Sequence, residues 1–137
     1  MIESLLILYK TDQQIEITWN KEEGDYPVLA DKIQINRLFT NLFKNAIEAS
    51  EDLEKIKIEV SLKKNNNKVR FSIADEGKGI PVEVRHKIFA PNFTTKSSGT
   101  GLGLAICRGI TEKANGNIWF STTDRGTVFY VEIPLDV

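Results

Sequence analysis

The sequence contains a single cysteine, Cys107, and a single histidine, His86. A lone cysteine excludes an internal disulfide and a cysteine-based metal cluster, and it fits a reducing compartment. The 18 basic and 19 acidic residues leave a formal net charge of -1, which gives no long-range attraction to nucleic acid or to an anionic membrane. No apolar run approaches the roughly 20 residues that cross a bilayer. We therefore expect a cytoplasmic domain with no nucleic-acid partner.

The chain is long enough to bury a hydrophobic core, since 137 residues suit one domain. We predict a single domain over residues 1–137. The opening sequence MIESLLILYK lacks the basic region and the cleavage site of a signal peptide. Leu5, Leu6 and Leu8 instead predict the packing face of a short helix, so residues 1–10 are expected to be the remnant of a junction helix.

Hydrophobic periodicity predicts a succession of helices and strands. Strands are expected at 14–19, 56–62, 68–75, 117–122 and 127–134, and helices at 31–50, at 102–114 and in a short piece from Pro81 toward Phe89. Asp31 and Gln34 have the spacing of a capping box at the start of the long helix. Lys63, Lys64 and the asparagines 65–67 predict a polar turn between two strands. A mixed sheet covered by helices on one side accommodates this order.

Two asparagines, Asn41 and Asn45, stand four residues apart on the predicted long helix, so both project from the same helical face. An amide oxygen is a neutral hard ligand that suits a Mg²⁺ ion already neutralised by phosphates. Asparagine is a poor helix former, so two of them in mid-helix cost stability for no local gain. The pair is a candidate metal and phosphate site, although two surface asparagines would show the same spacing.

The segment Asp75-Glu76-Gly77-Lys78-Gly79 directly follows a predicted strand. A carboxylate at a strand end can accept a hydrogen bond from an exocyclic amine such as adenine N6, and glycines permit positive φ and close backbone approach to a flat ring. Asp and Gly are equally typical of a plain turn. The motif alone leaves both an adenine site and a turn open.

A glycine-rich segment, Gly99-Thr100-Gly101-Leu102-Gly103-Leu104, opens the helix predicted at 102–114. Glycines ahead of a helix let free backbone N–H groups converge on anionic oxygens, aided by the helix dipole. The motif is not a P-loop, because no Gly-Lys-Ser/Thr closes it, and it lacks the βαβ context of a dinucleotide fingerprint.

Residues 90–101, APNFTTKSSGTG, are rich in Ser, Thr and Gly and predict a lid. Phe89 and Phe93 are candidates for anchoring this lid to the core. Lys96 is a candidate point charge for a terminal phosphate, and a solvated loop lysine is an equally good interpretation.

Together these motifs resemble the boxes of the GHKL superfamily of ATP-binding domains, and specifically the catalytic domain of bacterial histidine kinases. Residues 41–45 are similar to the N box, 75–79 to the G1 box, 89–93 to the F box and 99–104 to the G2 box. Gly126-Thr127 resembles a weaker last glycine motif. The boxes occur in order over residues 31–133. The segment IFAPNFTTKSSGTGLGLA is most similar to the corresponding segment of kinases of the nitrogen-regulation type.

The resemblance implies an α/β two-layer sandwich of the Bergerat type, with a mixed, mostly antiparallel sheet, helices on one face and a lid at 90–101 that covers ATP. It also implies that Asn45 binds Mg²⁺, that Asn41 contacts the phosphates and that Asp75 reads the adenine. The implied nucleotide-binding set is completed by Gly77, Gly79, Ile80, Phe89, Thr95, Lys96, Gly99, Thr100, Gly101, Leu102, Gly103, Leu104 and Thr127, and the implied catalytic residues are Asn41, Lys44 and Lys96.

The implied reaction is transfer of the γ-phosphoryl group of Mg-ATP to a histidine on dimerisation and phosphoacceptor helices, ahead of a response regulator in two-component signalling. Those helices are expected to be missing from this chain, which would then be a cytoplasmic monomer, with the cytoplasmic part of a membrane-bound sensor as an open alternative for its origin. His86 lies in a short polar segment outside any acceptor hairpin, so we expect no autophosphorylation of the chain alone.

Two positions depart from related sequences. Hydrolytic relatives place a glutamate base four residues before the metal asparagine, where this chain has Asn41, and an amide cannot take a proton from water. Many kinases carry a lysine three residues after the metal asparagine, where this chain has Glu48, so more weight falls on Lys44 or Lys96.

Two other functions stay open at this point. A GHKL kinase of the anti-sigma type acts on serine and needs no acceptor hairpin in cis, but the helix fragment at residues 1–10 argues against it. A non-catalytic nucleotide-binding module requires a damaged site, whereas Asn45, Asp75, Gly101 and Gly103 are all present.

Overall fold

The computed structural model describes residues 2–3, 6–7, 14–91 and 103–136. The elements follow in the order β1 (Ile15–Lys21), α2 (Lys32–Ala49), β2 (Ile56–Asn65), β3 (Lys68–Asp75), the 3₁₀ helix η1 (Val82–Lys87), α3 (Gly103–Lys113), β4 (Asn117–Thr123) and β5 (Gly126–Pro134). The predicted succession of helices and strands is confirmed, with modest shifts of the boundaries.

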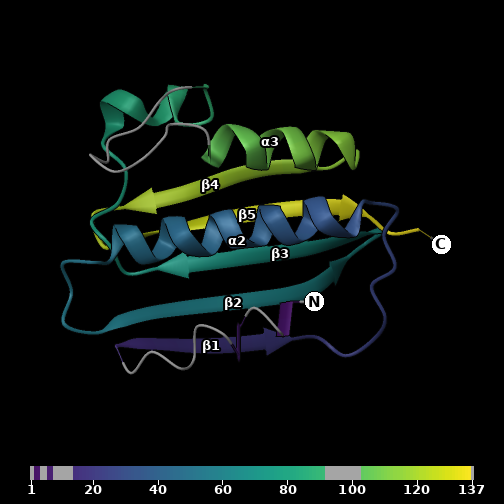
Figure 1. The fold of residues 1–137 in the computed structure, drawn as a ribbon, viewed down its shortest axis with the longest axis horizontal. Helices are drawn as coiled ribbons and strands as arrows, with labels where there is room; N and C mark the ends of the chain where they lie inside the picture. The colour runs from purple at the N-terminus through teal and green to yellow at the C-terminus, as the bar shows by residue number, and fades with distance from the viewer. Residues whose placement is uncertain (1, 4–5, 8–13, 92–102, 137) are drawn as a thin grey trace.

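The strands form one five-stranded sheet in the order β1-β2-β3-β5-β4 (Figure 1). β1 is parallel to β2, and the other neighbouring pairs are antiparallel. α2 and α3 lie over the same face of this sheet (Figure 1). The predicted α/β two-layer sandwich, with a mixed and mostly antiparallel sheet, is therefore confirmed.

The core lies between α2 and the sheet. Side chains along a strand alternate between its two faces, so Val69, Phe71 and Ile73 of β3 are all buried on the helix side. On α2, Leu38, Leu42 and Phe43 have an exposed fraction of 0%. Each buried side chain of this size contributes about 1.5–3 kcal/mol, which makes α2 a principal source of stability.

The start of α2 is fixed by the predicted cap. The Oδ1 atom of Asp31 accepts hydrogen bonds from the backbone N–H groups of Ile33, at 2.8 Å, and Gln34, at 3.3 Å. These bonds satisfy two of the N–H groups that a helix leaves without partners in its first turn. Because the cap fixes where the helix begins, it also fixes which face of the helix Asn41 and Asn45 occupy.

The predicted polar turn at 63–67 is wrong in its extent. Lys63, Lys64 and Asn65 continue β2 and pair with Arg70, Val69 and Lys68 of β3. Only Asn66 and Asn67 form the turn, and Asn66 has a φ of 59°. The lysines fit a strand because they are exposed, so their charges stay solvated.

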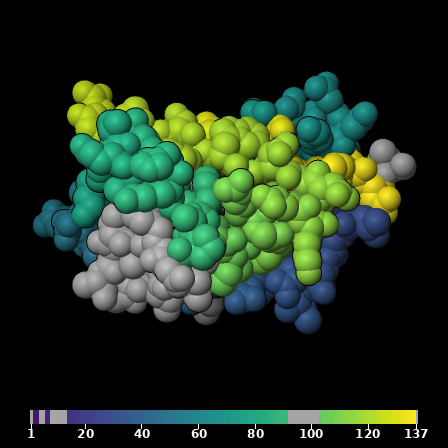
Figure 2. Space-filling model, turned by 90° about the horizontal axis from the view of Figure 1, so that it is seen from above, coloured from purple at the N-terminus to yellow at the C-terminus, as the bar shows by residue number. Residues whose placement is uncertain are grey.

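Two smaller elements complete the described part. Residues 2–3 and 6–7 are helical, and Ile2 and Leu6 are buried in the core; Leu5 and Leu8 of the predicted packing face lie outside the described residues. Figure 2 shows the surface of η1 next to that of α3. Within the described residues, no helix combines the length and the apolar character needed to cross a membrane.

Candidate nucleotide-binding site

The asparagine pair lies on α2, as predicted. Asn41 and Asn45 are half-buried, and Ala49 continues the same stripe one turn further at the end of the helix. Lys44, the predicted catalytic lysine of the same segment, is exposed. The stripe through Asn41, Asn45 and Ala49 forms one side of the candidate site.

Asp75 is buried at the end of β3, with an exposed fraction of 6%. Its Oδ1 atom accepts hydrogen bonds from the N–H of Gly77, at 2.9 Å, and from the N–H of Thr127, at 3.3 Å. The first bond closes residues 75–79, called the G1 segment below, into a turn, and the second bond connects that turn to β5. Thr127, one of the predicted nucleotide-binding residues, thus contacts Asp75 through its backbone.

Gly77 joins the G1 segment to α2. A Cβ atom at this position would lie 2.3 Å from the carbonyl oxygen of Ala49, so any side chain would push the two segments apart. The glycine is required by this close approach, and it places Asp75 beside the end of the Asn41–Asn45 stripe.

Gly79 joins the same segment to the β4–β5 hairpin. It has a φ of 78°, in the region that favours glycine, and a Cβ atom there would lie 2.0 Å from the carbonyl oxygen of Thr123. The next residue, Ile80, donates its N–H to Thr122 Oγ1 at 3.0 Å and accepts from Arg85 Nε at 2.9 Å. The G1 segment is therefore held by β3, α2 and β4 together.

Phe89 anchors the segment that leads into the predicted lid. Its ring centroid lies 6.1 Å from that of Phe120 and 6.3 Å from that of Phe129, the latter in an edge-to-face arrangement. Such aromatic contacts contribute about 0.5–1.5 kcal/mol beyond simple burial. Phe89 therefore packs against the core. Its role as an anchor of the lid stays a prediction, because Phe93 and most of the predicted lid lie outside the described residues.

α3 runs antiparallel to α2, which brings its start toward the asparagines. The end of α3 at Lys113 lies near Asp31 at the start of α2, and the Cys107 thiol donates to the carbonyl oxygen of Leu38 at 3.7 Å. Burial raises the pKa of the Cys107 thiol to about 12, although a hydrogen bond with the Asn41 side chain acts to lower it. Gly103 therefore begins α3 one turn beyond this contact, toward Asn45.

Part of the predicted site cannot be placed. Thr95, Lys96, Gly99, Thr100, Gly101 and Leu102 lie outside the described residues, as does most of the predicted lid. Of the remaining G2 residues, Gly103 is exposed and Leu104 is half-buried against the core. The structure thus brings Asp75, Gly77, Gly79, Ile80 and Thr127 together in and around the G1 segment, next to the end of the α2 stripe through Asn41 and Asn45. Gly103 lies at the start of α3, on the side of those asparagines.

Thr122 was not among the site residues predicted from the sequence. Its hydroxyl accepts from Ile80, at 3.0 Å, and lies 2.8 Å from the hydroxyl of Thr127. A signal was present, because alternation along the predicted strand puts Thr122 on the same face as Ile118 and Phe120, two half-buried side chains that pack against the core. A hydroxyl among apolar positions indicates a specific hydrogen-bond partner.

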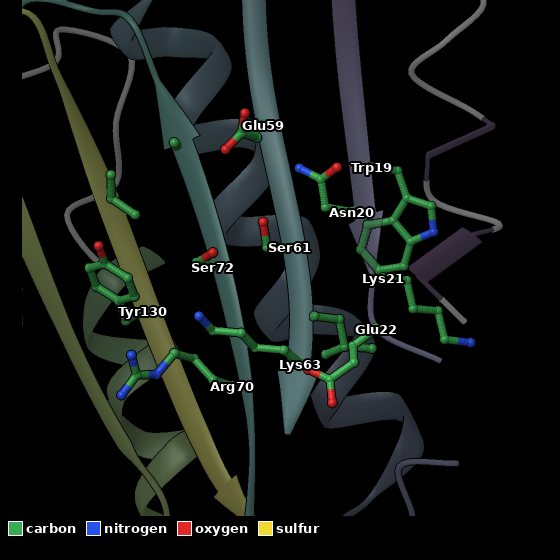
Figure 3. Close-up of a pocket in the computed structure, with 13 residues that line it drawn as sticks. Trp19, Asn20, Lys21, Glu22, Glu59, Ser61, Lys63, Arg70, Ser72 and Tyr130 are labelled. Atoms are coloured by element: carbon green, nitrogen blue, oxygen red, sulfur yellow. The ribbon is translucent and has the colours of Figure 1, made fainter. Parts of the chain in front are cut away.

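A hollow of about 750 Å³ lies on the face of the sheet opposite to α2 and α3 (Figure 3). Small side chains in its middle, Ser61, Ser72 and Ala74, leave the space between longer neighbours. None of the predicted site residues that the structure describes lines it.

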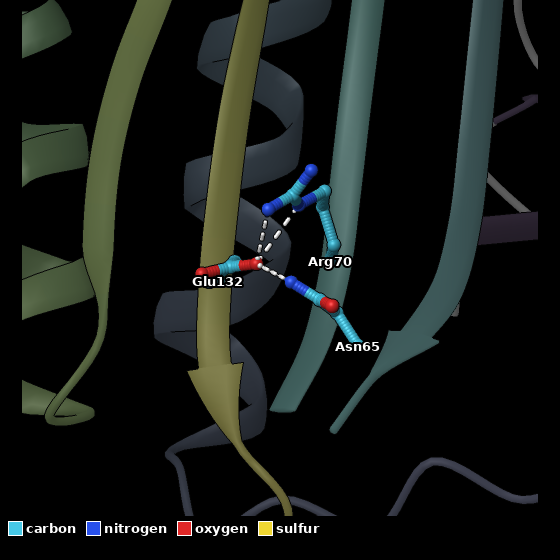
Figure 4. A network of polar contacts seen from close by, with 3 residues as sticks. All are labelled: Asn65, Arg70 and Glu132. Atoms are coloured by element: carbon cyan, nitrogen blue, oxygen red, sulfur yellow. Dashed lines mark hydrogen bonds and ion pairs between the residues drawn. The ribbon is translucent and has the colours of Figure 1, made fainter. Parts of the chain in front are cut away.

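On the same face, Glu132 accepts hydrogen bonds from Asn65 Nδ2, at 2.8 Å, and Arg70 Nε, at 2.8 Å (Figure 4). Burial opposes ionisation of Glu132, but these hydrogen bonds and the charge of Arg70 hold its pKa below the usual value. The Arg70 guanidinium also lies 5.3 Å from the Trp119 ring and 5.9 Å from the Tyr130 ring. This network fastens β3, β4 and β5 together away from the candidate site.

The family described as "Histidine kinase-, DNA gyrase B-, and HSP90-like ATPase" matches residues 30–137. The chain belongs to this family. Among solved structures, the nucleotide-free catalytic domain of histidine kinase ThkA aligns with a TM-score of 0.87 and 39% identity, over 98% of this chain and 90% of that chain. The chain is accordingly the ATP-binding catalytic domain of a histidine kinase.

Longer proteins contain a similar domain. The adaptive-response sensory kinase SasA of Prochlorococcus marinus (strain MIT 9313) is 33% identical over 97% of this chain and 38% of its own length. The sensor protein FixL of Bradyrhizobium diazoefficiens is 31% identical over 90% of this chain and 25% of its own length. The chain spans well under half of the length of each of these relatives.

Proposed function

We propose that this domain binds Mg-ATP and donates the γ-phosphoryl group to a histidine on separate dimerisation and phosphoacceptor helices, as one step of two-component signalling. The observation that carries the proposal is the convergence of three motifs on one place. Asp75 and the Asn41–Asn45 stripe come from distant parts of the sequence and meet where Gly77 packs against Ala49, and α3 runs antiparallel to α2 so that its start lies on the side of the asparagines.

The adenine end of the site is assigned to Asp75. Its carboxylate is held in place by the N–H groups of Gly77 and Thr127, and a carboxylate is a strong acceptor for the exocyclic amine of adenine. Gly77 and Gly79 have no side chains to keep the base at a distance, and Ile80 offers an apolar contact.

Mg²⁺ is assigned to Asn45. Among the described residues, no group of three or more His, Cys, Asp or Glu side chains could hold a metal ion alone. Mg²⁺ commonly takes one or two protein oxygens together with phosphates and water, so the amide oxygen of Asn45 fits that role. When bound, the ion would neutralise charge on the phosphates.

The phosphate end is assigned to Asn41 and to the start of α3 at Gly103. Backbone N–H groups in the first turn of a helix favour anionic oxygens, and the helix dipole adds to that preference. Lys44 and Lys96 are proposed as the cations that meet the transferred group, with Thr95, Gly99, Thr100, Gly101, Leu102 and Leu104 completing the lid side. In phosphoryl transfer the protein acts mainly by positioning and by stabilising charge, and these residues supply both.

The acceptor and the downstream partner are further parts of the proposal. ThkA, which is 36% identical over 98% of this chain, has been solved in complex with the response regulator protein TrrA, so we assign this domain a response regulator of its own. SasA is named a sensory kinase and FixL a sensor protein, which does not favour a serine kinase of the anti-sigma type. Residues 1–10 as a junction helix, residues 90–101 as the lid, the likeness to nitrogen-regulation kinases, the monomeric state and the cytoplasmic location remain predictions.

The test is calorimetric titration with a non-hydrolysable ATP analogue, first with Mg²⁺ and then with excess chelator. We expect saturable binding that weakens without Mg²⁺ and falls at least about tenfold in Asp75→Asn. The asparagine oxygen can still accept from Gly77 and Thr127, so this variant should stay folded. The matched control is Glu76→Gln, which removes the same charge from an exposed neighbouring residue and should bind like the wild type.

No heat at millimolar nucleotide, or unchanged binding in Asp75→Asn, would contradict the nucleotide site. A phosphohistidine on the isolated chain after incubation with ATP would instead contradict the placement of the acceptor on separate helices.

A further inference from the structure

We infer that Thr122 is a positioning residue that makes the site selective for a base with an amino group, and against a base with a carbonyl oxygen at the same position. The inference rests on the proposed nucleotide site and goes beyond it, because Thr122 belongs to none of the motifs that define that site. Its side chain acts through Ile80 and Thr127 rather than by touching the base.

Thr122 lies where the G1 segment meets the β4–β5 hairpin. Its Oγ1 accepts the N–H of Ile80 at 3.0 Å and lies 2.8 Å from Thr127 Oγ1 and 3.4 Å from the carbonyl oxygen of Gly126. Thr127 in turn donates its N–H to Asp75 at 3.3 Å. One hydroxyl therefore connects both sides of the segment that carries Asp75.

A count of protons favours one direction for these bonds. A hydroxyl has one proton to donate and two lone pairs to accept. If Thr122 accepts from both Ile80 and Thr127, its own proton is left for Gly126, and all three neighbouring groups are satisfied. If Thr122 instead donates to Thr127, the carbonyl of Gly126 loses this partner. The first arrangement makes one more hydrogen bond.

That arrangement determines what Thr127 offers to a ligand. Its proton is used on Thr122, so its hydroxyl oxygen presents only lone pairs, and the backbone N–H of the same residue is bonded to the carboxylate of Asp75. Two neighbouring acceptors match the two N–H groups of an exocyclic amine such as that of adenine. They repel the carbonyl oxygen that guanine and hypoxanthine carry at that position. Selectivity between acceptor and donor groups of this kind is strong because a mismatch leaves buried polar groups unpaired.

The experiment compares affinities for the non-hydrolysable analogues of ATP and GTP in the wild type and in Thr122→Val. Valine keeps the branched shape but removes the hydroxyl, so Thr127 regains a proton that it can donate. We expect the ATP analogue to bind about tenfold more weakly and the GTP analogue to lose less, so that the selectivity ratio falls. The matched control is Thr123→Val, which removes an exposed neighbouring hydroxyl whose contact is the N–H of Arg125 at 3.1 Å.

A second pair of variants separates selectivity from folding. Thr122→Ser and Thr122→Ala both lose the methyl group and differ only in the hydroxyl, so the pair carries the test even if valine destabilises the hairpin. We expect serine to keep the wild-type selectivity and alanine to lose it.

Equal weakening of both analogues in Thr122→Val and Thr122→Ala would overturn the inference, because it would show a structural role only. Wild-type selectivity in Thr122→Ala would overturn it as well. If the wild type bound neither analogue, the proposed function itself would fail, and that outcome is distinct from the other two.

Discussion

Gly103 allows the phosphate end of the site to be tested without disturbing the fold. It is the first residue of α3, it is exposed, and a Cβ atom built on it meets nothing within 4 Å in the described part of the chain. The fold therefore gives no reason for glycine at this position. A close approach of phosphate oxygens to the helix start does, since a methyl group would stand in their way.

The two consequences of Gly103→Ala have opposite signs. Alanine is a better helix former than glycine by at most about 1 kcal/mol, and less in the first turn. For a chain of 137 residues the unfolding entropy is roughly 0.3 kcal/mol/K, so the melting temperature should stay unchanged or rise by up to about 3 °C. Affinity for Mg-ATP analogues should fall at least about tenfold, which corresponds to about 1.4 kcal/mol.

Both quantities are measured on the same samples, stability by thermal unfolding without nucleotide and affinity by calorimetry. Gly109→Ala is the matched control, because this glycine lies further along α3 and its Cβ would also meet nothing within 4 Å. It should gain about 0.5–1 kcal/mol of stability and bind nucleotide like the wild type. Wild-type affinity in Gly103→Ala would refute the contact between α3 and the phosphates, and a loss of stability would refute the open space assigned to this position.

Two further predictions concern stability. Gly77→Ala should lower the free energy of unfolding in urea by about 1–3 kcal/mol, because its Cβ would lie 2.3 Å from the Ala49 carbonyl oxygen; an unchanged midpoint would mean that the two segments are not in contact. Glu132→Gln should cost about 1–3 kcal/mol at pH 7, because a charged acceptor is lost. The pKa of Glu132 is lowered in the folded protein, so its contribution is present above the ordinary glutamate pKa of about 4.3 and is lost as the pH falls through the folded value. Urea titrations at pH 7 and near pH 3 check this, and a difference that does not shrink in acid would contradict it.

The sequence predicted those parts of the site that depend on local chemistry. The Asp31 cap fixes the start of α2, and helical spacing then places Asn41 and Asn45 on one stripe. Asp75 closes its own turn through Gly77, a contact between residues two apart in the sequence. Interactions over such short separations are encoded in a few neighbouring residues, so they could be recognised without knowledge of the tertiary structure.

Contacts between distant segments could not be recognised in this way. Gly77 is a glycine because of the Ala49 carbonyl, and Gly79 because of both its positive φ and the Thr123 carbonyl. The role of Thr122 depends on the pairing of β4 with β5 and on the packing of the G1 segment against their hairpin. The parallel pairing of β1 with β2 was equally open, since periodicity gives the faces of a strand but not its neighbours.

The proposed adenine end of the site is therefore inseparable from the fold, whereas the start of α3 is not. Asp75, Gly77 and Gly79 each bind or contact another element through backbone groups, so most substitutions there change stability and binding together. A loss of affinity in such a variant cannot by itself identify a contact with the nucleotide. Variants that change one hydroxyl or one exposed hydrogen, Thr122→Ser against Thr122→Ala and Gly103→Ala against Gly109→Ala, leave the contacts of Asp75, Gly77 and Gly79 intact. The Thr122 pair tests the contact with the base, and the Gly103 and Gly109 pair tests the contact with the phosphates. The two comparisons can therefore assign the two ends of the nucleotide independently.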